Sequence, residues 1–239
     1  MRNTLAIARR ELRFYFDSPI AYIVLVAFLL VSGWMFFSQL FLIGRADLRP
    51  LFAPSPFSPS MLLVILVPAI TMRQISEERK TGTIELLTTM PLRDVEIIAG
   101  KFIAALGLIT AALVLTLGYA LTVSSLGPLD WGATFAGYVG LFLFAAALTA
   151  VGVLCSTTTD NQIVAFIIGF IVCSALYLMY YLQFYMPAGA AGLVDYLSTS
   201  SHLANLSRGV IDTRDVIYYL SLTGGSLVLA TRALARLHA

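Results

Sequence analysis

The stretch PIAYIVLVAFLLVSGWMFFSQLFLIG, residues 19–44, decides the fold of this chain. It contains no Asp, Glu, Lys or Arg, and roughly 20 mostly apolar residues are enough for a helix to cross a bilayer. The stretch is too long for a cleaved signal peptide, starts too late in the chain, and lacks a convincing small-x-small cleavage site. Because a backbone in lipid must satisfy its own hydrogen bonds, we expect a membrane-spanning helix here.

Five further apolar stretches follow the first. They cover residues 51–72, 95–126, 131–157, 163–186 and 216–234. The second stretch is the weakest, because Pro54, Pro56 and Pro59 indicate a broken or late start. No stretch shows the alternation of apolar and polar residues that a membrane β-barrel requires. The sequence therefore predicts an all-α polytopic membrane protein, with six transmembrane helices in a single domain over residues 1–239.

Composition indicates the same class of protein. Hydrophobic residues make up 59% of the 239 residues, charged residues only 12%, and the mean hydropathy is +0.88. A soluble domain carries about 25% charged residues, so this chain has too few to cover a water-soluble surface. We expect the lipid bilayer as its surroundings, and no nucleic acid as a partner.

The basic residues predict how the helices are oriented. Six spans place both termini on one side of the membrane, and that side holds eleven of the fifteen Lys and Arg residues. By the positive-inside rule, both termini are cytoplasmic. Residues 1–17 mix apolar and basic residues, as in RNTLAIARRELRFYF at 2–16, and this pattern is typical of an amphipathic helix along the inner membrane surface.

The spans carry no Asp, Glu, Lys or Arg in their centres, which disfavours an ion-coupled carrier. The chain also lacks a G-x-x-x-x-G-K-[ST] phosphate loop, since Gly100-Lys101 is followed by Phe102 and preceded by no glycine-rich loop. If the protein moves a substrate against a gradient, the energy must come from another chain.

Cysteine and histidine residues indicate no metal or catalytic site. Cys155 and Cys173 lie in or beside apolar stretches and are interpreted as small hydrophobic residues. His202 and His238 are far apart and are interpreted as surface or interfacial polar residues. We therefore expect no cofactor, metal or catalytic residue in this chain.

The most densely charged segment lies between the second and third spans. It is part of AITMRQISEERKTGTIELLTTMPLRDVEIIAGKF, residues 69–102, which closely resembles the signature of ABC-2 type transporter permeases. In that family a span runs into an E-E-(R/K)-x-x-G-T-(I/L)-E-L-L segment, followed by a proline and then by a G-K that opens the next span. The residues that fill this pattern are Glu77, Glu78, Arg79, Gly82, Thr83, Glu85, Leu86, Leu87, Pro91, Gly100 and Lys101.

Two more stretches resemble the gliding-motility-associated subfamily of these permeases: STTTDNQIVAF at 156–166 and SSHLANLSRGVIDTRDVIYYLS at 200–221. The resemblance implies a half-transporter in the bacterial cytoplasmic (inner) membrane. Two membrane subunits would pair, and each would dock onto a cytoplasmic ABC ATPase. The second membrane subunit would be an identical chain or one with a large extracytoplasmic domain, and ATP and Mg²⁺ would bind to the two ATPase subunits.

The resemblance also implies short helices outside the spans. These are an elbow helix at residues 1–17, a cytoplasmic coupling helix between spans two and three, and short re-entrant helices between spans five and six. The stretch AAGLVDYLSTSSHLANLSRGV, residues 190–210, has apolar residues roughly at helical spacing, as re-entrant helices need. An ordinary external loop remains the alternative for these residues.

The coupling helix is predicted over residues 84–90, seated in a groove of the ATPase. Thr81 or Thr83 would cap it, Gly82 would keep the entry turn slim, and Pro91 would end it. The alternative is a solvated loop whose charges only fix the topology. The predicted ATPase-coupling interface consists of Glu77, Glu78, Arg79, Thr81, Gly82, Thr83, Ile84, Glu85, Leu86 and Leu87.

The sequence therefore predicts the permease subunit of an ATP-driven ABC transporter, with export as the expected direction. An alternative function from another class is a membrane scaffold, in which the ATPase drives periplasmic partners without moving a substrate. Proteoliposome assays with and without ATP distinguish the two hypotheses.

Overall fold

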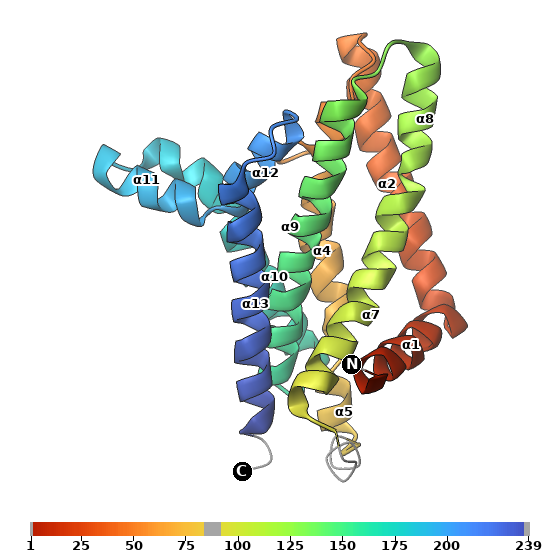
Figure 1. Cartoon of the computed structure of the whole chain (residues 1–239), viewed down its shortest axis with the longest axis vertical. Coiled ribbons are helices and arrows are strands. Elements are labelled where there is room, and N and C mark those ends of the chain that lie inside the picture. The colour runs from red at the N-terminus through yellow and green to blue at the C-terminus, as the bar shows by residue number, and fades with distance from the viewer. Residues whose placement is uncertain (1, 84–91, 237–239) are drawn as a thin grey trace.

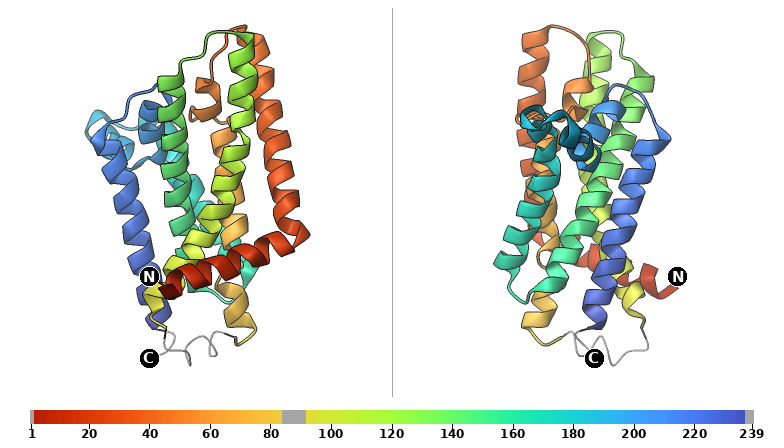
Figure 2. Two further views of the ribbon diagram at one scale, coloured as in Figure 1. Left: turned by 45° about the vertical axis from the view of Figure 1, so that its right-hand side comes forward. Right: turned by 90° about the vertical axis from the view of Figure 1, so that its left-hand side faces the viewer.

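The computed structural model describes residues 2–83 and 92–236. Within these two ranges all regular secondary structure is helical, which confirms the predicted all-α class. The long helices run side by side in one elongated bundle (Figures 1 and 2). One end of the bundle holds the short helix α5 (Ser76–Lys80), and we call it the α5 end. The start and the end of the chain both lie toward it (Figure 1).

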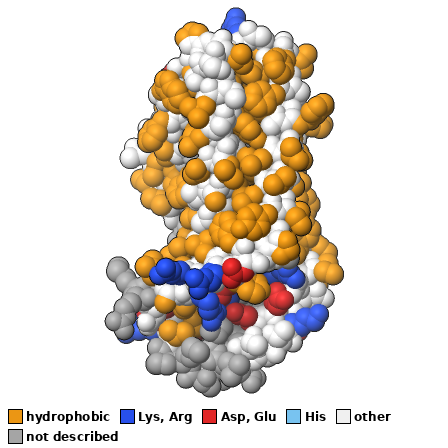
Figure 3. All heavy atoms as spheres, turned by 90° about the vertical axis from the view of Figure 1, so that its right-hand side faces the viewer, with side chains coloured by type: hydrophobic (Ala, Val, Ile, Leu, Met, Phe, Trp, Pro, Cys, Tyr) orange, Lys and Arg blue, Asp and Glu red, His pale blue; other side chains and the backbone are white. Residues whose placement is uncertain are grey.

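The first two helices correspond to the segment predicted as an elbow helix and to the first predicted span. Helix α1 (Arg2–Asp17) crosses the α5 end, and α2 (Pro19–Ile43) runs from there along the bundle (Figure 2). Pro19 opens α2, where a missing N–H leaves no intrahelical bond unmade. Leu5 and Phe14 of α1 are exposed, while Ile7 is buried. Figure 3 shows acidic and basic side chains gathered at this end, below a broad apolar surface.

The second predicted span, 51–72, is shorter than its predicted bounds. Helix α3 (Arg49–Phe52) ends early, and α4 (Pro59–Thr71) begins only after the proline-rich segment. Pro59 takes the first position of α4, so the late start that the prolines indicate is confirmed. Residues 53–58 lie outside both helices because prolines at 54 and 56 remove N–H donors and disfavour a helix before them.

The next three helices cover the third and fourth predicted spans. Helices α7 (Asp94–Leu115) and α8 (Leu117–Leu126) follow one another along one side, and α9 (Trp131–Thr158) returns beside α7 (Figure 1). Asp130 begins α9 by accepting hydrogen bonds from the backbone N–H groups of Gly132 and Ala133. These bounds agree closely with the predicted spans at 95–126 and 131–157.

The last part of the chain contains α10 (Gln162–Leu182), the 3₁₀ turn η1 (Gln183–Tyr185), α11 (Ala188–Leu197), α12 (Thr199–Ser207) and α13 (Thr213–Ala235). The segment between α10 and α13 is thus helical rather than an ordinary loop. Helix α12 packs against α9 with Leu203 and Leu206 buried, whereas α11 projects from the bundle (Figure 1). Re-entry into a membrane stays a prediction for this pair.

Helix α9 is the centre of the packing. It contacts α4, α7, α10, α12 and α13, and its small residues allow these helices to approach closely. A Cβ atom at Gly140 would lie 2.6 Å from Cβ of Leu206 in α12, and one at Gly152 would collide with the side chain of Thr71 in α4. Both glycines therefore serve packing within the chain.

Five of the described helical segments are long and apolar enough to cross a membrane. They are Ala21–Ile43, Pro59–Lys80, Asp94–Leu126, Trp131–Thr158 and Gln162–Leu182. The sixth predicted span, 216–234, does form a helix, because α13 covers it. At 23 residues α13 is long enough to cross a membrane, but it is not among the five segments because its composition does not qualify. Its glycines, hydroxyl-bearing residues and charges lower its hydropathy. The five-segment result supports a multi-pass membrane protein.

Candidate functional site

The described part of the predicted ATPase-coupling interface lies on and directly after α5. Glu77, Glu78 and Arg79 belong to α5, and the chain continues through Thr81, Gly82 and Thr83. The remaining members, Ile84, Glu85, Leu86 and Leu87, lie outside the described residues, as does the predicted coupling helix at 84–90. The structure therefore describes the residues directly before that segment, 77–83, which we call its base.

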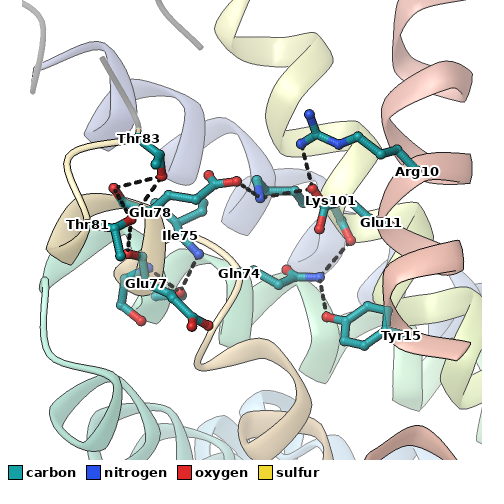
Figure 4. Close-up of polar contacts among 12 residues, drawn as sticks. Arg10, Glu11, Tyr15, Gln74, Ile75, Glu77, Glu78, Thr81, Thr83 and Lys101 are labelled. Carbon is teal, nitrogen blue, oxygen red and sulfur yellow. Dashed lines mark hydrogen bonds and ion pairs between the residues drawn. The ribbon is translucent and has the colours of Figure 1, made fainter. Parts of the chain in front are cut away.

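A buried lysine connects this base to two other helices. Lys101 of α7 has a side chain only 2% exposed, and its Nζ lies 2.7 Å from Oε1 of Glu78 and 3.4 Å from Oε1 of Glu11 in α1 (Figure 4). Nη2 of Arg10 also donates to Oε1 of Glu11, at 2.9 Å. A buried ammonium is tolerated only where carboxylates compensate its lost hydration. We call Lys101, Glu11 and Glu78 the Lys101 junction.

The close packing of α1 on α7 positions this junction. A Cβ atom at Gly100 would lie 2.7 Å from Cγ2 of Ile7 and 3.1 Å from the backbone oxygen of Thr4. Any side chain at residue 100 would therefore push α1 away from α7. The adjacent Gly100 and Lys101 thus act together, since the glycine allows the contact of α1 and the lysine binds its carboxylate.

A second polar group lies beside the junction. Nε2 of Gln74 donates to the backbone oxygen of Lys101 at 2.8 Å and to the hydroxyl of Tyr15 at 3.3 Å (Figure 4). Because a carbonyl oxygen only accepts, the amide nitrogen of Gln74 must face Lys101. Burial raises the pKa of Tyr15 to about 12, so its hydroxyl keeps the proton that it donates to the backbone oxygen of Ile70.

Helix α5 is also tied to the end of α9. Oγ of Ser156 accepts from the backbone N–H groups of Ile75 and Ser76, at 3.1 and 3.2 Å, and donates to the backbone oxygen of Met72 at 3.1 Å. Nη1 of Arg79 donates to the backbone oxygen of Thr157 at 2.8 Å. These bonds satisfy N–H groups at the start of α5 and a backbone oxygen at the end of α9, which would otherwise be unpaired.

The end of α5 is shaped by threonine and glycine. The hydroxyl of Thr81 donates to the backbone oxygen of Glu77 at 2.9 Å and pairs with that of Thr83, also at 2.9 Å. Gly82 has φ +71°, a left-handed conformation that side chains disfavour and glycine adopts freely. The predicted role of Thr81 or Thr83 as the cap of the following helix concerns residues outside the described ranges.

The sequence alone did not identify the Lys101 junction. In the sequence, Lys101 stands out only as part of a G-K pair, and nothing assigns a role to Glu11. Two signals were available: the lysine lies inside an apolar stretch, and Glu11 is the one acidic residue within an arginine-rich segment that ends at Asp17. A buried lysine demands a carboxylate, but the sequence does not reveal which of the acidic residues supplies it.

A second buried ionisable pair lies near the other end of the bundle and corrects one interpretation. His202 of α12 is buried, not a surface residue. Its Nδ1 lies 2.6 Å from Oδ1 of Asp215 in α13, and its Nε2 lies 3.0 Å from the backbone oxygen of Tyr196. Tyr218 stacks on the imidazole with ring centroids 4.0 Å apart. This cluster joins α11, α12 and α13.

Comparison with known proteins assigns the family. The profile of the ABC-2 family transporter proteins matches residues 51–229, about three quarters of the chain. This chain belongs to the ABC-2 family. The matched range includes α5, Gly100 and Lys101, so two members of the junction, Glu78 and Lys101, lie within it, whereas Glu11 precedes it. A comparison with curated proteins finds no match.

Membership in the ABC-2 family identifies a multi-pass membrane protein and suggests the permease component of an ABC transporter. It also implies an ABC ATPase as partner, because ABC-2 permeases are typically non-catalytic membrane subunits. Among residues 2–83 and 92–236, no three His, Cys, Asp or Glu side chains are grouped so that they could hold a metal ion.

Proposed function

We propose that this chain is the permease subunit of an ATP-driven exporter and that the segment after α5 transmits the work of a separate ATPase. The observation that carries the proposal is the Lys101 junction. Through Glu78, it ties the base of that segment to α7 and α1. A displacement of the base would therefore be passed to both helices.

The mechanism starts from how firmly α5 is attached. Glu78 binds Lys101, and Arg79 binds the end of α9, so both side chains are engaged within the bundle. Glu77 has a side chain 45% exposed and faces outward enough to meet a partner. We assign Glu77, Thr81 and Thr83, together with the outlying members of the interface at 84–87, to contact with the ATPase. Glu78 and Arg79 would transmit its movement.

The wider assembly follows the ABC-2 family pattern. Two ATPase subunits would hold ATP and Mg²⁺, while this chain holds neither. A second membrane subunit, identical or with a large extracytoplasmic domain, would complete the transporter, as in the gliding-motility-associated subfamily. We assign α13 as the sixth span and α1 as the elbow helix, so that both termini are cytoplasmic in a bacterial inner membrane.

Reconstitution with the cognate ATPase tests this function. Glu85→Arg should leave insertion into the membrane intact but weaken ATPase binding or separate hydrolysis from transport. Asp47→Arg is the matched control, because Asp47 lies in the loop between α2 and α3 and its side chain is 43% exposed. Wild-type coupling in Glu85→Arg would refute the coupling role. ATP hydrolysis without movement of any cargo would favour the mechanical scaffold.

Orientation requires its own test. In a background without Cys155 and Cys173, a single cysteine at Gly192 should react with an impermeant thiol reagent in intact cells. A cysteine at Thr81 should react only after the membrane is opened. Labelling at Thr81 in intact cells would reverse the proposed orientation without affecting the coupling test.

A further inference from the structure

A cavity of about 520 Å³ lies beside the Lys101 junction, between α1, α2, α4–α5 and α7. Its lining changes character along the bundle. Nearest the α5 end, its charged residues are Arg10, Glu11, Arg73, Glu77, Glu78 and Lys101. Farther from that end, its apolar residues are Ala21, Val24, Ala69, Ile70 and Leu108. The cavity is thus polar at one level and apolar at the next.

The charged level is balanced, with three basic and three acidic side chains. Lys101 and Arg10 together balance the charges of Glu11 and Glu78. The remaining opposite charges of the lining are Arg73 and Glu77. Nε of Arg73 lies 3.5 Å from Oε2 of Glu77, and both side chains are 45% exposed. A balanced lining favours neither a net anion nor a net cation. It suits a group that carries both charges side by side.

The apolar level determines what kind of molecule carries that group. Val24 and Leu108 line this apolar part of the cavity. The neighbouring residues of α2 that are exposed on the outside of the bundle are also apolar or aromatic, among them Tyr22, Ile23 and Val26. Figure 3 shows the charged side chains directly below this apolar surface. Each CH₂ group removed from water contributes about 0.8 kcal/mol, so an attached hydrocarbon chain would dominate the affinity. A soluble zwitterion would leave this level unfilled.

We propose that this cavity binds one zwitterionic aminophospholipid from the membrane leaflet at the α5 end. Arg10 and Arg73 face the phosphate, Glu77 accepts hydrogen bonds from the protonated amine, and an acyl chain lies against Val24 and Leu108. The cavity shares Glu77 with the proposed ATPase contact, but lipid binding itself requires no ATPase and is measured without one. Such a lipid would fill the space between α1 and the bundle.

Quenching of tryptophan by brominated lipids tests the proposal on the full chain in vesicles. Phe14 lines the cavity and is itself aromatic, so Phe14→Trp is introduced together with Trp34→Phe and Trp131→Phe. Brominated phosphatidylethanolamine should quench this tryptophan more than brominated phosphatidylcholine or phosphatidylglycerol at the same mole fraction. Phosphatidylcholine carries the same charges without an N–H donor, and phosphatidylglycerol carries a net negative charge.

Three variants and a second tryptophan reporter complete the test. Arg73→Gln or Glu77→Gln should reduce the preference about two- to fivefold, as expected for a partly exposed charge contact. Arg9→Gln, an exposed residue of α1 that does not line the cavity, should leave it unchanged. Trp34 of α2 is 79% exposed and, as the sole tryptophan, should report bulk lipid without preference.

The outcomes separate the alternatives. Equal quenching by phosphatidylethanolamine and either other lipid overturns the proposal, as does the same preference at Trp34. Free phosphoethanolamine should not displace the lipid. If it does, the site binds a soluble zwitterion and the lipid assignment is wrong. None of these results depends on an ATPase, so the coupling proposal stands or falls separately.

Discussion

The Lys101 junction predicts that Lys101→Met lowers the stability of the wild type but raises the stability of a variant that lacks both carboxylates. Lys101 is 2% exposed, whereas its partners Glu11 and Glu78 have side chains 15% and 20% exposed. Removing the lysine leaves two carboxylates that still reach water, and one of them keeps Arg10. Removing both carboxylates instead leaves a buried ammonium with no counter-charge. The two changes break the same contacts but should differ in cost.

The magnitudes follow from this asymmetry. Glu11→Gln combined with Glu78→Gln should destabilise the fold by about 3–5 kcal/mol, the usual cost of stranding a buried charge. Lys101→Met keeps the length of an unbranched side chain and loses charge-assisted hydrogen bonds, so about 1–3 kcal/mol is expected. Of the single changes, Glu78→Gln should cost more than Glu11→Gln, because its contact is 2.7 Å rather than 3.4 Å.

Adding Lys101→Met to the double variant should then raise stability, although the same change lowers it in the wild type. Replacing a complete buried ion cluster by apolar or neutral groups is often close to neutral. Thermal unfolding of the purified chain in one detergent, followed by circular dichroism, measures the four proteins side by side. If Lys101→Met lowers the midpoint in both backgrounds, the ammonium is not stranded by loss of the carboxylates, and the junction is not what stabilises this region.

Three further predictions use the same unfolding measurement. Gly100→Ala should cost about 1–3 kcal/mol by overpacking the contact of α1 with α7, while Gly118→Ala, with nothing within 4 Å of the new Cβ, should be neutral or stabilising. Ser156→Ala should cost about 1–3 kcal/mol, because it leaves two backbone N–H groups of the α4–α5 turn unpaired. His202→Ala should cost about 3–5 kcal/mol, because it leaves Asp215 buried without its partner. Adding Asp215→Ala should recover part of that loss. A double variant that is no more stable than His202→Ala would argue against the pairing.

The helix boundaries were predictable where local chemistry sets them. Pro19 and Pro59 begin helices because they fit the first helical position, and Asp130 and Asn161 begin helices by accepting backbone N–H bonds. Each signal is contained in a few adjacent residues. The predicted spans that carry such signals agree with the structure within a few residues, apart from the first residues of span 51–72, where hydropathy outweighed the prolines.

The sixth span and the two buried ion clusters were beyond local reasoning for different reasons. Helix α13 is helical where predicted, but its composition alone does not qualify it as a span, so its environment depends on what packs around it. Lys101 and Glu11 are separated by ninety residues, and no periodic pattern connects them. His202 and Asp215 are closer in sequence, yet only the fold of α12 against α13 turns them toward each other.

An apolar residue at position 101 would pack against α1 and α5, but it would accept many arrangements of those helices. An ammonium that needs two carboxylates accepts few, because its hydrogen bonds are directional and its burial without them is costly. Lys101 therefore specifies which faces of α1 and α5 meet α7, and Gly100 specifies how closely α1 approaches. If the segment after α5 passes force from an ATPase to the bundle, as we propose, it requires such a defined base. A loosely packed base would absorb the movement in local rearrangement.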